Sequence, residues 1–65
     1  MHHLLIVDDH PLYRMALRQT LAAALPEARI DEAGDLAAAH AALDAAPDTD
    51  LVLLDLQLPG THGLL

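Results

Sequence analysis

Three aspartates stand where two apolar runs of the sequence end. The run "LLIV" is followed at once by Asp8 and Asp9, and the run "LVLL" is followed by Asp55. Short apolar runs that end at polar residues are typical of strands buried on both faces of a parallel sheet. Because ligands bind at the carboxyl ends of such strands, the three carboxylates are candidates for one common site.

Carboxylates that share a pocket repel one another, and either protonation or a bound cation must relieve that repulsion. Oxygen atoms from carboxylates, a main-chain carbonyl and water are the ligands that Mg²⁺ accepts. A divalent cation beside a carboxylate also suits phosphoryl transfer, because it offsets the negative charges of the nucleophile and the phosphoryl group. The three aspartates therefore predict phosphoryl chemistry that depends on Mg²⁺.

The strands that must position these aspartates follow from the apolar pattern and its turn signals. We expect strands at 3–7, 28–33 and 50–55, the first ending at Asp8 and Asp9. The third is expected to be a central strand. The mixed polarity of "ARIDEA" marks the second as an edge strand.

Two helices are expected between these strands. The first begins near Pro11, which suits an initial helical turn, and ends at Pro26. Its apolar face consists of Tyr13, Leu17, Leu21 and Ala24. The second takes Asp35 as its N-cap and ends at Pro47, with high helix propensity from its alanines. Its inner face is expected to combine Leu36, Ala39, His40 and Leu43. The alternation of strands and helices predicts an α/β fold with a parallel sheet in a three-layer arrangement.

Composition limits the size of the domain and the class of its partners. The chain has 65 residues and is 54% hydrophobic, but Tyr13 is its one aromatic residue, so the core must be thin. The absence of cysteine excludes disulfides and thiolate metal sites. A net charge of −7 argues against nucleic-acid binding by this segment. The apolar run near the start is too short for a signal peptide or a membrane span, so we expect a cytoplasmic protein.

Two longer stretches carry a family resemblance. "LLIVDDHPLYR" and "LVLLDLQLPGTHGLL", with one helix-strand-helix interval between them, resemble the amino-terminal half of a bacterial two-component response-regulator receiver domain. The amino-acid sequences of both stretches are similar to those of regulators with a carboxyl-terminal LuxR-type helix-turn-helix. The resemblance covers residues 1–65 and implies a truncated flavodoxin-like, CheY-like fold with strand order 2-1-3.

The resemblance also implies roles for matching residues. Asp55 would be the phospho-acceptor, Asp9 a direct Mg²⁺ ligand, Asp8 a contributor through water, and the main-chain carbonyl of Gln57 a further ligand. The implied phosphodonor is a sensor histidine kinase. A DNA-binding output domain outside this segment would control transcription. The implied activity is that of a phospho-acceptor rather than an enzyme.

The chain departs from the family pattern at its end. A complete receiver also has a hydroxyl residue after a fourth strand and a lysine after a fifth, whereas this chain contains no lysine and stops at Leu65. Residues 1–65 are therefore expected to form a partial receiver domain. The third strand would then have an open edge, and we expect it to pair with the same strand of a second copy in a homodimer.

Other interpretations of the same residues stay open. A phosphatase of the haloacid-dehalogenase type also places an aspartate after an apolar strand, but it usually has a second aspartate two residues later, where this chain has Gln57. A structural fragment that assembles without chemistry is the other alternative. The five histidines match no zinc-binding pattern and are expected to be scattered. Arg14 and Arg18 are expected on a solvated helix face.

Overall fold

The computed structural model describes residues 2–55, which form strands and helices in the predicted alternating order. The elements are β1 (His3–Asp8), α1 (Pro11–Ala24), β2 (Arg29–Ala33), α2 (Leu36–Ala45) and β3 (Leu51–Asp55). Their bounds agree with the expected ones to within a residue or two. Neither helix in this part of the chain combines the length and the hydrophobicity that a membrane crossing requires.

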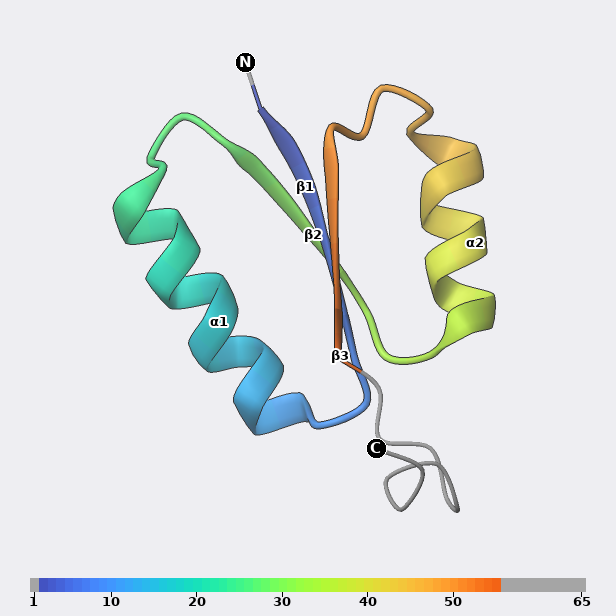
Figure 1. Ribbon diagram of the computed structural model, residues 1–65, viewed down its shortest axis with the longest axis horizontal. Coiled ribbons are helices and arrows are strands. Elements are labelled where there is room, and N and C mark those ends of the chain that lie inside the picture. The colour runs from blue at the N-terminus through green and yellow to red at the C-terminus, as the bar shows by residue number, and fades with distance from the viewer. Residues whose placement is uncertain (1, 56–65) are drawn as a thin grey trace, which may run out of the picture.

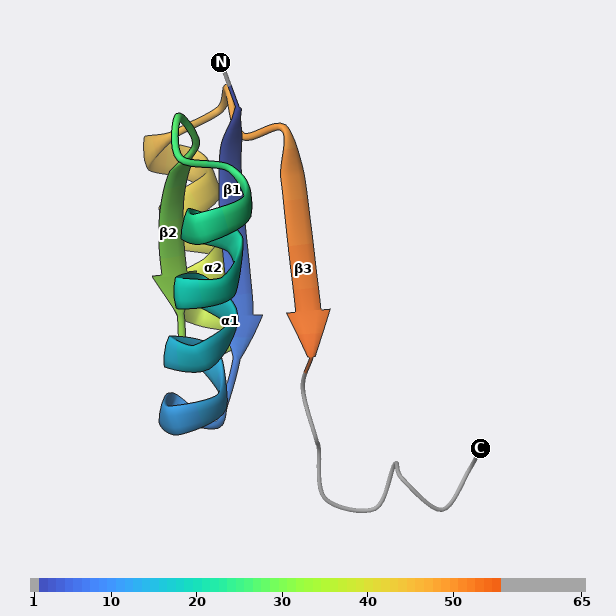
Figure 2. The same cartoon turned by 90° about the vertical axis from the view of Figure 1, so that its left-hand side faces the viewer.

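The three strands are parallel and lie in the order β2-β1-β3, as the resemblance implied. In this register Val7 of β1 stands opposite Ala33 of β2 and Leu54 of β3. Helix α1 covers one face of the sheet and α2 covers the other (Figures 1 and 2). The predicted three-layer α/β architecture is therefore confirmed.

The core is built around β1, because this strand has a neighbour on each side and a helix on each face. Every residue of β1 is buried. The alanine-rich helix α2 lies on the sheet and contributes small side chains to this core. The buried cluster and the residues packed against it are Leu5, Val7, Ala33, Ala39, Ala42 and Leu43.

The apolar run of the third strand is typical of a central strand buried on both faces, but within residues 2–55 β3 lies at the edge of the sheet, as the expected strand order 2-1-3 and the expected open edge imply. Leu51, Val52 and Leu54 of β3 are 50%, 40% and 62% exposed. The reason is positional, since β3 pairs with β1 alone and neither helix packs on it within residues 2–55. The central strand of this sheet is β1.

The inner faces of both helices differ from the expected ones. On α1, Tyr13 and Ala24 are exposed, while Leu17 and Leu21 are half-buried together with Arg14. The helix is rotated toward Arg14 because this side chain bonds to the sheet below it.

On α2 the buried or half-buried residues are Ala39, Ala42 and Leu43, whereas Leu36 and His40 are exposed. The N-cap prediction is confirmed, since the Asp35 carboxylate accepts a hydrogen bond from the Ala38 N–H at 2.7 Å.

Candidate functional site

The carboxyl ends of β1 and β3 bring two of the predicted site residues together. Asp8 ends β1, Asp55 ends β3, and the two are paired across the parallel ladder. Asp9 follows Asp8 in the connection to α1. Gln57 lies outside the described residues, so its predicted role stays a prediction.

The two carboxylate oxygens of Asp8 have different surroundings. The side chain is completely buried, and its Oδ1 accepts a hydrogen bond from the main-chain N–H of His10 at 2.7 Å. This bond closes the turn between β1 and α1. Within residues 2–55, Oδ2 has no hydrogen-bond partner. A buried carboxylate oxygen without a donor is costly, and a bound cation would satisfy it.

Asp9 and His10 complete a group of potential cation ligands beside Asp8. The Asp9 side chain is about one-third exposed, and its Oδ1 lies 3.0 Å from Nδ1 of His10. The same ring nitrogen is 3.5 Å from Oδ1 of Asp8. One ligand atom from each of the three residues lies within 4.8 Å of the other two. The donor set therefore fits a divalent cation, and it includes a histidine that the sequence pattern did not single out.

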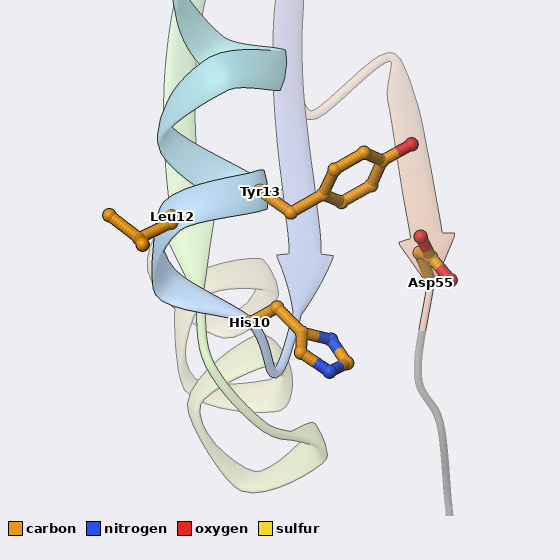
Figure 3. A pocket seen from close by; sticks show the side chains of 4 residues that line it. All are labelled: His10, Leu12, Tyr13 and Asp55. Atoms are coloured by element: carbon orange, nitrogen blue, oxygen red, sulfur yellow. The ribbon is translucent and has the colours of Figure 1, made fainter.

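Asp55 lines a cleft and is not one of the three residues of this group. The cleft has a volume of about 490 Å³, and its described lining consists of His10, Leu12, Tyr13 and Asp55. Figure 3 shows that the side chains of His10 and Tyr13, both at the start of α1, extend toward the end of β3. Asp55 is exposed, so its side chain can be reached from solvent.

Arg14 is a residue whose role the sequence pattern missed. Its Nη1 donates a hydrogen bond to the main-chain oxygen of Asp8 at 2.7 Å, and its Nε donates to Oε1 of Glu32 at 3.0 Å. A Cβ atom at Gly34 would lie 3.1 Å from Arg14 Nη1, so glycine leaves room for the guanidinium. Arg14 thus joins the start of α1 to the ends of β1 and β2. The prediction of a solvated helix face was wrong for Arg14, whose side chain is 21% exposed. It agrees with Arg18, whose side chain is 55% exposed.

A second polar cluster occupies the opposite end of the sheet. His3 is buried, and its Nε2 lies 2.7 Å from Oδ2 of Asp31. The main-chain N–H of His3 donates to the carboxylate of Asp50 at 2.8 Å. The His3 hydrogen bond, supported by the charge of Arg29, lowers the pKa of Asp31. This cluster joins the starts of the strands and stands apart from the three predicted site aspartates.

Comparisons with known proteins identify the family of this chain. The sequence profile of the response regulator receiver domain matches residues 4–65. The chain is 42% identical over 64 residues to the glycerol metabolism activator of Pseudomonas putida, covering 98% of this chain and 29% of that protein. It is 45% identical over 62 residues to the nitrate/nitrite response regulator protein NarP of Escherichia coli, covering 92% of this chain and 27% of NarP.

A third relative is the nitrate/nitrite response regulator protein NarL of Escherichia coli, which is 36% identical over 63 residues, or 94% of this chain and 28% of NarL. No solved structure gives a significant match. The chain therefore spans less than a third of the length of these relatives. The profile match covers nearly the whole chain, and the strand order agrees with it. The chain belongs to the response regulator receiver domain family.

Proposed function

We propose that Asp55 accepts a phosphoryl group from a phosphohistidine on a sensor histidine kinase. One observation carries this proposal: the exposed Asp55 is paired in the sheet register with the buried Asp8, whose Oδ2 has no partner among the described residues. An accessible nucleophile thus stands next to carboxylates that favour a cation. Membership of the receiver family supports the same assignment.

The proposed reaction is an in-line displacement at phosphorus. A carboxylate oxygen of Asp55 forms a bond to phosphorus while the bond from phosphorus to the histidine nitrogen breaks. The product is an aspartyl phosphate; the electron pair of the broken bond stays on the histidine nitrogen, and the imidazole leaves as the neutral ring because its other nitrogen carries a proton. Mg²⁺ would be held by Asp9 and Asp55, by Asp8 through water, and by the main-chain carbonyl of Gln57. When bound, it would neutralise negative charge on the phosphoryl oxygens.

The chain is best understood as a phospho-acceptor module of a longer regulator. Its relatives are more than three times as long as the matched segment, which supports a parent protein with further domains. We infer that residues 1–65 are part of its receiver domain, and that the parent acts in the cytoplasm and controls transcription through a DNA-binding output domain. Asp55 is modified in this scheme, and the chain is not itself a turnover enzyme.

The kinase is proposed to dock on the first turns of α1. Leu12 and Met15 on this helix are 80% and 49% exposed, and the helix begins beside the cleft that holds Asp55. Exposed apolar side chains next to a reactive group are suited to hold a protein partner while the group reacts. Contact here would bring the phosphohistidine to the open side of Asp55.

Phosphorylation of the full-length parent tests this function. With Mg²⁺ and acetyl phosphate, the wild-type protein should gain one phosphate, and Asp55→Asn should gain none, because the amide is not a nucleophile toward phosphorus. Asp44→Asn, which changes an exposed carboxylate near the end of α2, is the matched control and should be labelled normally. Undiminished labelling of Asp55→Asn would refute the assignment.

We further propose that the chain of residues 1–65 forms a homodimer through β3. Within residues 2–55, this strand pairs on one side only, with β1. Its open edge contains neither a proline nor a lysine, and three of its apolar side chains are exposed. A two-fold axis would pair two copies of β3 in antiparallel fashion and extend the sheet across both chains.

A further inference from the structure

Tyr13 lines the cleft beside Asp55, and the proposed function gives this residue no role. Tyr13 lies on the first turn of α1, and its side chain lines the same cleft as Asp55. Figure 3 shows its ring extending from α1 toward β3, so that the hydroxyl is the end nearest the strand that carries Asp55. The side chain is half exposed, although the apolar pattern of α1 predicted it to be part of the buried face.

A phosphoryl group on Asp55 would need hydrogen-bond donors in this cleft, because its oxygens are negatively charged. Among the described lining residues, His10 and Tyr13 are the ones whose side chains carry donors. The Nδ1 atom of His10 is directed to the carboxylates of Asp9 and Asp8, at 3.0 and 3.5 Å, so Nε2 is the nitrogen of this ring that these contacts leave free. The structure records no hydrogen bond from the Tyr13 hydroxyl to another residue of the range 2–55, so this donor is available.

The position of Tyr13 is held from both sides along the helix. Pro11 occupies the start of α1, where its restricted backbone suits the first helical turn. Arg14, the next residue after Tyr13, is bonded to the main-chain oxygen of Asp8 and to Glu32. These contacts attach the first turn of α1 to the ends of β1 and β2. The tyrosine is therefore presented to the cleft by a fixed part of the backbone.

We propose that Tyr13 is a catalytic residue that donates a hydrogen bond from its hydroxyl to an oxygen of the phosphoryl group during transfer to Asp55. This inference rests on the proposed function of Asp55 and adds a residue to it. In the reaction with acetyl phosphate, an oxygen of Asp55 bonds to phosphorus, the bond from phosphorus to the acetyl oxygen breaks, and acetate leaves. The hydroxyl of Tyr13 keeps its proton throughout and stabilises the negative charge on the oxygens that do not react.

The test compares initial rates of phosphorylation of the full-length parent by acetyl phosphate at saturating Mg²⁺. Tyr13→Phe retains the ring and removes only the donor, so its rate should fall about fivefold, the effect of one hydrogen bond. Tyr13→Ala should fall at least as far. Leu36→Ala removes an exposed apolar side chain from α2, on the opposite face of the sheet, and should react at the wild-type rate.

A second measurement separates a direct contact from a disturbed fold. The Mg²⁺ concentration at half-maximal rate should be the same in Tyr13→Phe and in the wild-type protein, because the hydroxyl is not among the predicted cation ligands. A wild-type rate in Tyr13→Phe would overturn the inference and leave the role of Asp55 intact. A wild-type protein that is not labelled at Asp55 would overturn both.

Discussion

At the scale of single residues, the pair formed by His3 and Asp31 connects protonation to stability. The Nε2 atom of His3 lies 2.7 Å from the Asp31 carboxylate, and this hydrogen bond, helped by the charge of Arg29, lowers the pKa of Asp31. A carboxyl whose pKa is lowered by folding stabilises the fold at pH values above its unfolded pKa of about 3.9. That contribution is lost as the pH falls through the lower pKa of the folded state.

Replacement of Asp31 should therefore change the acid dependence of folding. Asp31→Asn keeps an acceptor for His3 but carries no charge, so its free energy of unfolding should decline less than that of the wild type between neutral pH and about pH 3. Urea unfolding across this range measures the difference. Glu27→Gln, in the exposed turn before β2, serves as the control and should keep the wild-type slope. An equal decline in Asp31→Asn and the wild type would contradict the assigned role of the pair.

At the scale of elements, the junction between β1 and α1 combines a structural and a chemical task in one side chain. The Oδ1 atom of Asp8 closes the turn by accepting the His10 N–H, while Oδ2 is buried and has no partner within residues 2–55. The N-cap His10 offers no side-chain cap to α1, so the turn depends on Asp8 and on Arg14, which holds the Asp8 carbonyl. The strand, the turn and the helix are thus connected through the first predicted site residue.

The substitution Asp8→Asn separates the two tasks. The amide oxygen can still accept the His10 N–H, but the buried negative charge is removed. Without Mg²⁺, we expect this variant to be at least as stable as the wild-type chain, because an unpaired buried charge costs free energy. Added Mg²⁺ should raise the thermal unfolding midpoint of the wild type and leave that of the variant nearly unchanged.

Thermal unfolding followed by circular dichroism, with and without Mg²⁺, measures both effects. Asp44→Asn removes an exposed charge near the end of α2 and should retain the full Mg²⁺ response. An Asp8→Asn variant that Mg²⁺ stabilises as strongly as it does the wild type would show that Asp8 takes no part in a cation site.

At the scale of the whole molecule, the open edge of β3 determines how the chain is expected to assemble. Full burial of a leucine stabilises a fold by about 1.5–3 kcal/mol. Leu51 and Leu54 are 50% and 62% exposed, so within residues 2–55 each leaves part of this stabilisation unrealised. Pairing of two copies would satisfy the edge hydrogen bonds and cover some of this apolar surface. The three strands of each copy would then form one continuous sheet in the order 2-1-3-3-1-2.

Analytical ultracentrifugation of the 65-residue chain at micromolar concentration should show a dimer. Val52→Lys places a charge on the proposed junction and should shift the chain to monomer, because a lysine on an edge strand opposes pairing. Leu36→Lys, on the exposed surface of α2, should leave the dimer intact. A well-folded monomer of the wild-type chain, or a dimer in which the β3 edge stays unpaired, would refute this assembly.

The sequence by itself determined the elements and the residues that end them. Apolar runs, Pro11 and the Asp35 cap are local signals, and local signals act within a few residues, so strands and helices could be placed from the pattern alone. The convergence of Asp8 and Asp55 was also predictable, because parallel strands end at the same edge of a sheet. The receiver motif supplied the strand order.

Only the tertiary structure decided which faces are buried and which polar atoms meet. The apolar run of β3 did not reveal that neither helix covers it within residues 2–55, because burial depends on neighbours distant in sequence. Periodicity likewise could not show that Arg14 would replace Tyr13 on the inner side of α1, since Arg14 bonds to atoms of β1 and β2. The same rotation leaves Tyr13 facing Asp55, because the side of a helix that a sheet does not cover is set by packing and not by the pattern of residue types.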